Sequence, residues 1–176
     1  MLTIHSPERN LAFEQSFSRI WGVRNDDGTY EFALVADDAA GQADRSSPGA
    51  VLHPVRREPL HQVMDIRVLW RPMPGTEARL ADNATITWYI LPDAPSESGE
   101  VLEYRGTAFV AVRPREDVAQ VAIRRGTISL NGRRGALHDP IGPASVSGEF
   151  TAINDSARLT QVLADARARA SGLAKR

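Results

Sequence analysis

Apolar and polar residues alternate along the chain between His61 and Ala152, which is the pattern of half-buried β-strands. A similar alternation flanks Asn25–Gly28, where Asp and Gly suit a tight turn, so we expect a hairpin over residues 17–36. Further strands are expected near 61–70, 83–91, 101–112, 118–131 and 144–152. Alternate residues of a strand share one face, and this parity predicts a core that includes Trp70, Trp88, Ile66, Ile86, Tyr104, Val110 and Phe150.

Three places depart from simple alternation. Gly106 lies on the inward parity of its strand, which predicts a β-bulge or the close approach of another backbone. The apolar parity changes across Arg124–Gly126, as it does when one extra residue bulges out of a strand. The segment Ser6–Phe17 carries both a helix-start signal, in which Ser6 precedes Pro7, and a strand-like alternation, so both alternatives stay open.

The period becomes helical near the end of the chain, where Leu159, Val162, Leu163 and Ala166 recur at helix spacing. We therefore expect a helix over 154–171, against one side of the sheet or over a barrel opening. Residues 37–60 are rich in Gly, Pro and charge without a period, which predicts a long mobile loop. The chain thus reads as one β-rich domain over 1–176: an antiparallel β-sandwich or barrel-like sheet with one C-terminal α-helix.

Composition narrows the function classes. The 176 residues hold 21 Lys and Arg against 22 Asp and Glu, and this balance gives no reason to expect nucleic acid or an anionic membrane as a partner. The absence of cysteine excludes disulfides and thiolate zinc sites. The four histidines lack the close spacing of a metal motif, and no phosphate loop or dinucleotide fingerprint occurs, so we expect no metal, nucleotide or other cofactor.

Residue usage also bears on source and compartment. The abundance of Ala, Arg and Asp with few Lys is typical of a bacterial protein from a GC-rich genome. We expect no transmembrane segment, since no stretch approaches the roughly 20 apolar residues of a membrane span. No secretion signal is recognisable, so the chain as it stands fits the cytoplasm, and a removed signal would place it in the periplasm or cell envelope.

One set of charged residues lies on the parity opposite the core. Asp65, Arg67, Glu103 and Arg105 share this parity on two predicted strands, and the strand between them carries Thr85, Thr87 and Tyr89. If the three strands are neighbours, opposite charges face one another across a polar sheet face, which the 37–60 loop is placed to cover. Such carboxylates suit acid–base chemistry. The simpler interpretation is a solvated face with weak cross-strand ion pairs.

A second polar cluster follows the fourth main-sheet strand. Arg133 and Arg134 lie within Gly132–Gly135, and His138 comes shortly after. Arginine pairs bind phosphate or carboxylate through charge-assisted hydrogen bonds. The simpler interpretation is a hairpin loop with solvated arginines. His138 and Asp139 are adjacent, so on an extended chain their side chains point apart and do not form an acid–base pair.

Two functions fit these patterns. The first is a non-enzymatic binding or structural domain, of a bacterial envelope or a larger assembly, that contacts a protein, a second copy of itself or a small apolar ligand. The second is an enzyme or small-ligand carrier with a site at a barrel mouth lined by arginines and carboxylates. The missing catalytic motifs favour the first. A packed interior would favour the first function, and a cavity of roughly several hundred Å³ with convergent polar groups would favour the second.

Overall fold

The computed structural model describes residues 1–38, 60–70, 82–92, 101–135, 139–171 and 174–175. Most of the predicted 37–60 loop, residues 39–59, lies outside this described part, so the prediction that it is mobile stays a prediction. The elements in chain order are β1 (Leu2–Ser6), β2 (Leu11–Gln15), β3 (Arg19–Arg24), β4 (Tyr30–Asp38), β5 (Leu60–Val68), β6 (Ala84–Pro92), β7 (Val101–Pro114), β8 (Val118–Arg134), β9 (Ala144–Asn154), α1 (Ser156–Ala170) and β10 (Ala174–Lys175).

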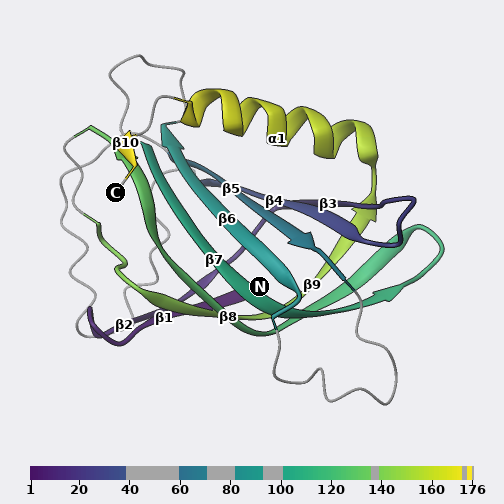
Figure 1. The fold of residues 1–176 in the computed structure, drawn as a ribbon, viewed down its shortest axis with the longest axis horizontal. Coiled ribbons are helices and arrows are strands. Elements are labelled where there is room, and N and C mark those ends of the chain that lie inside the picture. Colours follow the sequence, from purple (N-terminus) through teal and green to yellow (C-terminus); the bar gives the residue numbers. More distant parts are fainter. Residues whose placement is uncertain (39–59, 71–81, 93–100, 136–138, 172–173, 176) are drawn as a thin grey trace.

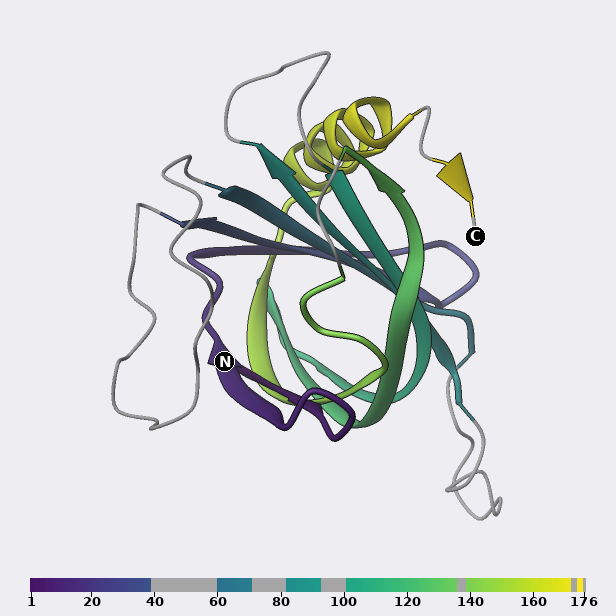
Figure 2. The same cartoon turned by 90° about the vertical axis from the view of Figure 1, so that its left-hand side faces the viewer.

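The sheet closes into a barrel (Figures 1 and 2). Seven of the described strands follow the order β8-β7-β6-β5-β4-β3-β9, and β9 then pairs with β8 to complete the ring. The outer strands β1 and β2 extend the sheet beyond β9, and β10 pairs with the end of β8. Every pairing is antiparallel except that of β3 with β9, where Trp21 faces Ile153 and Gly22 faces Asn154. The fold is therefore a mixed barrel, which confirms the predicted barrel-like β-sheet and adds one parallel pair to its antiparallel pairings.

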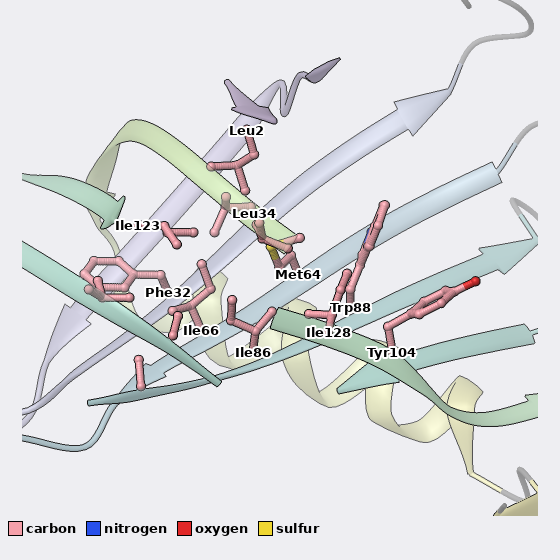
Figure 3. Packing of buried hydrophobic residues seen from close by; sticks show 14 of the residues in the cluster. Leu2, Phe32, Leu34, Met64, Ile66, Ile86, Trp88, Tyr104, Ile123 and Ile128 are labelled. Atoms are coloured by element: carbon pink, nitrogen blue, oxygen red, sulfur yellow. The ribbon is translucent and has the colours of Figure 1, made fainter. Parts of the chain in front are cut away.

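Large apolar side chains fill the interior of the barrel (Figure 3). Trp88, Tyr104 and Phe32 are fully buried. The rings of Trp88 and Tyr104 lie 5.8 Å apart between centroids. At one end, the Tyr104 hydroxyl donates to Asp139 Oδ1 at 2.8 Å, and nearby Ile141 joins the interior cluster. The barrel is therefore a packed core, as in other small barrels whose inward residues fill the space.

Six of the seven predicted core residues are buried, and Trp70 is the exception. Its side chain is 37% exposed, because β5 ends at Val68 and the chain beyond no longer follows the pleat. The side-chain amide of Asn83 donates to the Trp70 carbonyl at 3.1 Å and to the Val110 carbonyl at 2.9 Å, which ties this exit from the strand to β7. Parity gives the buried face only inside a strand, so the prediction for Trp70 is wrong.

The three irregular places in the sequence are now resolved. Residues Ser6–Phe17 continue as the β1–β2 hairpin, so the strand alternative is correct. Phe109 of β7 pairs with Arg125 of β8 and Val110 pairs with Ile123, so Arg124 is an extra residue in β8. This confirms the predicted bulge. Gly106 is a site of close approach, since a Cβ there would lie 1.6 Å from the backbone oxygen of Thr127.

The predicted C-terminal helix is confirmed, and it lies across the outside of the barrel over β3 to β7 (Figure 1). Asp155 caps it, because its side chain accepts the Arg158 backbone N–H at 2.9 Å. Its apolar stripe, Leu159, Leu163, Ala166 and Ala170, packs on outward-facing residues of the sheet such as Val35, Val63 and Tyr89. Within the described residues, no helix is long and apolar enough to cross a membrane.

Candidate functional site

An open groove of about 480 Å³ runs beside α1, between the second half of the helix and the outer face of β5 to β8. We call it the α1 groove. The strand order β5-β6-β7, which the sequence-based expectation required, is confirmed and brings outward polar side chains of three strands together. The charged and phenolic residues that line it are Asp65, Arg67, Tyr89, Glu103, Arg105 and Arg167.

An ion-pair network joins the β5 side of the groove to the helix. Arg167 of α1 places Nη2 2.8 Å from Asp65 Oδ2 and 3.0 Å from Glu31 Oε1. Arg67 places Nε 2.9 Å from the same Glu31 oxygen and 3.5 Å from Asp65 Oδ2. Glu31 lies directly across from Arg67 in the β4–β5 register. The network therefore fixes the helix against the sheet and holds Arg67 through its Nε.

Asp65 is the most constrained acid of the groove. Its side chain is 6% exposed, and its Oδ1 is buried without a hydrogen-bond partner in the described part of the chain. Burial raises the pKa of this carboxyl, although the hydrogen bond from Arg167 and the charge of Arg67 act in the opposite direction. An unpartnered buried acceptor is costly for folding.

A second carboxylate–arginine pair lies on β7. Glu103 is 8% exposed, and its Oε1 forms an ion pair with Arg105 Nε at 2.7 Å and accepts a hydrogen bond from Asn131 Nδ2 at 2.5 Å. Asn131 is the extra residue of a further bulge in β8, because Glu103 pairs with Gly132 and Tyr104 with Leu130. Bulges re-aim side chains beside functional sites, and this one aims Asn131 at Glu103.

Neutral hydroxyl groups occupy the strand between the two pairs. Tyr89 lies directly opposite Glu103, while Thr87 lies between Asp65 and Arg105 in the same row. Thr85 occupies the next row, opposite Arg67. Burial raises the pKa of Tyr89, and the neighbouring charges of Glu103 and Asp65 raise it further, so the phenol stays protonated at neutral pH. The groove floor therefore offers hydroxyls that both donate and accept hydrogen bonds.

The two strand arginines share one arrangement. Each is held at Nε by a carboxylate, and about half of each side chain is exposed: 47% for Arg67 and 54% for Arg105. Among the described residues, their terminal Nη groups have no hydrogen-bond partner. A guanidinium oriented in this way presents its outer edge to planar oxyanions such as carboxylate or phosphate. With Glu31 included, three carboxylates balance the three arginines, so the groove has no net charge.

The structure places the other predicted site residues elsewhere. The expected loop at Gly132–Gly135 is wrong for its first residues, because β8 continues through Arg134. Arg134 donates to the carbonyls of Arg169 and Ser171 and so binds the C-terminal end of α1. Arg133 lies opposite Leu102 in the β7–β8 pairing and does not line the groove. His138 lies outside the described residues.

Sequence reasoning missed Glu31, Asn131 and Arg167. Arg167 belongs to a helix, and the contact of one helical side chain with a strand 102 residues earlier has no local signature. Asn131 is aimed by a bulge that the sequence does not mark, since the residues after it are polar and no shifted apolar parity follows. Across the described residues, no group of three or more His, Asp or Glu side chains is arranged to hold a metal ion. Comparison with family models, curated proteins and solved structures finds no match for this chain.

Proposed function

We propose that this barrel is a non-enzymatic binding domain whose ligand is a small organic anion held in the α1 groove. The observation that carries the proposal is the pair Arg67 and Arg105. A carboxylate contacts each side chain at Nε, Glu31 at 2.9 Å from Arg67 and Glu103 at 2.7 Å from Arg105, and both arginines line the groove. Orientation of this kind lowers the entropy that binding would cost, because the donors are already in place.

Because side chains fill the interior, the proposed ligand site lies on the outside of the barrel. A small apolar ligand would need an apolar cavity, and the interior cluster around Trp88, Tyr104 and Phe32 is filled by side chains. The α1 groove is polar, so the proposal keeps the small-ligand expectation and changes the ligand from apolar to polar. The balanced charges around the groove give no support for nucleic acid, whose binding surfaces are strongly basic. A protein partner or a second copy stays a prediction.

A titration followed by ¹H–¹⁵N NMR tests the proposal. Sodium acetate and D-glucuronate are added to the whole chain while backbone amides and arginine Nε–H signals are recorded. We expect saturable shifts confined to β5, β6, β7 and the second half of α1, and the loss of these shifts in the R67Q/R105Q double variant. R124Q is the matched control, because Arg124 also forms an exposed ion pair, with Glu149 at 3.3 Å, but outside the groove. Shifts that persist in R67Q/R105Q, or no saturable shift, would refute the proposal.

One observation favours a second function. Asp65 lines the groove, and its pKa is raised by burial, which is typical of a carboxylic acid that gives up a proton during hydrolysis. An enzyme of this kind would bind its substrate in the same groove. In that case D65N would abolish turnover of a bound ligand while leaving its affinity within a few-fold, whereas a binding domain shows no turnover in either protein.

A further inference from the structure

The α1 groove combines three kinds of group, and together they restrict the chemistry of the ligand. Its edges carry arginine donors, its floor carries neutral hydroxyls, and Asp65 and Glu103 are carboxylates that contact these arginines. The question is which small anion would satisfy all three. This inference rests on the proposed function and deepens it.

The charge pairs in the groove favour neutral ligand groups over a cation. Asp65 already contacts Arg167 and Arg67, and Glu103 already contacts Arg105, so the charge of each acid is compensated. An ammonium group placed here would lie close to these guanidinium groups and be repelled by them. A hydroxyl group carries no charge and so carries no such penalty.

The groove floor is also suited to hydroxyls. Thr85 and Thr87 are half-buried at neighbouring rows of β6, and the Tyr89 phenol lies at the next row on the same face. These groups donate and accept, as the hydroxyls of a polyol do. A groove of about 480 Å³ lies within the size range of small-molecule sites.

We infer that the ligand of the α1 groove is a polyhydroxylated carboxylic acid, a sugar acid in chemical class. Its carboxylate binds the outer edges of Arg67 and Arg105. Its hydroxyls bind Thr87 and the Tyr89 phenol.

Isothermal titration calorimetry with four probes tests this inference: acetate, D-glucose, and two sugar acids, D-glucuronate and D-gluconate. Two additional hydroxyl hydrogen bonds, each of ordinary strength, correspond to about tenfold in affinity. We therefore expect at least one sugar acid to bind about tenfold or more tightly than acetate, and glucose to bind more weakly than that acid. Thr87→Val removes one hydroxyl at nearly constant shape and should weaken the sugar acid about threefold to tenfold while leaving acetate unchanged.

Thr127→Val is the matched control, because Thr127 is an exposed strand threonine that does not line the groove. Equal affinity for acetate and both sugar acids would overturn the sugar-acid inference and leave the proposed anion site intact. Tighter binding of a zwitterion such as glycine, added as a fifth probe, would also overturn it. Absence of binding by every anion would overturn the inference and the proposed function together.

Discussion

Trp88 and Trp70 provide the sharpest test of the barrel interior, because the sequence assigns both to the core and the structure separates them. Trp88 is 1% exposed, whereas Trp70 is 37% exposed and lies beyond the end of β5. A buried aromatic side chain removes roughly 150–250 Å² from water, which is about 4–6 kcal/mol at 25 cal/mol per Å². Alanine keeps a small part of this burial, and a residual cavity adds to the loss.

One feature of Trp88 reduces the expected cost. Its indole Nε1 is buried without a hydrogen-bond partner in the described part of the chain, which is a penalty of about 1–3 kcal/mol that the substitution removes. We therefore expect Trp88→Ala to lower the free energy of unfolding by about 3–5 kcal/mol. Trp88→Phe, which also removes the N–H but fills most of the space, should cost only about 1 kcal/mol. Trp70→Ala should cost less than about 1 kcal/mol.

Urea denaturation followed by far-ultraviolet circular dichroism measures these differences without relying on the tryptophan signal itself. A typical domain has only about 5–15 kcal/mol of stability, so Trp88→Ala can approach the limit of folding, and Trp88→Phe keeps the test informative. A Trp88→Ala protein as stable as Trp70→Ala would show that the interior is not packed around this residue. A Trp88→Phe cost as large as that of Trp88→Ala would contradict the expectation that the phenyl ring fills most of the space left by the indole.

Three further predictions follow from local geometry. Gly106→Ala places a Cβ against the Thr127 backbone oxygen, so it should destabilise the barrel by about 3 kcal/mol or more, which a shift in the urea midpoint would show and an unchanged midpoint would contradict. Burial raises the pKa of Asp65 in the folded protein above the unfolded value of about 3.9, so the contribution of this group to stability falls as pH rises above that value. D65N removes this contribution. The unfolding free energy of the wild type minus that of D65N should therefore decrease from about pH 4 to pH 7, and a difference independent of pH would refute the prediction. Asp155→Ala removes the cap from Arg158 N–H and should cost about 1 kcal/mol, with helix α1 losing amide-exchange protection before the strands do; a loss that begins in the strands would contradict it.

The alternation of apolar and polar residues was sufficient to predict the main strands, because each of them buries one face in the barrel and the apolar side chains mark that face. A change of apolar parity likewise located the Arg124 bulge, since apolar residues follow it. The same signal failed at Asn131, where polar residues follow, and at Trp70, where the strand has already ended. Barrel closure was not predictable, because the β3–β9 contact consists of only two residue pairs, between the middle of β3 and the end of β9.

The groove was predictable on the sheet and unpredictable on the helix. Asp65, Arg67, Glu103 and Arg105 were found because strand order converts shared parity into a shared surface. Arg167 and Glu31 were not, because their contact depends on the angle at which α1 crosses the barrel. The helix turns an ordinary polar sheet face into a walled groove, and only the three-dimensional structure shows that wall.

The way in which β9 closes the barrel governs the order of events during synthesis. The first strand, β1, has β9 as one of its two partners, with Leu2 facing Gly148. Strand β3 also pairs with β9, but only with the last two residues of β9. A nascent chain that has emerged through β8 therefore exposes strand edges that await residues not yet translated. Contacts this distant along the chain make folding slow. Ribosome-bound chains that stop before residue 144 should consequently bind chaperones and resist refolding, whereas chains from which α1 has fully emerged should fold into the closed barrel.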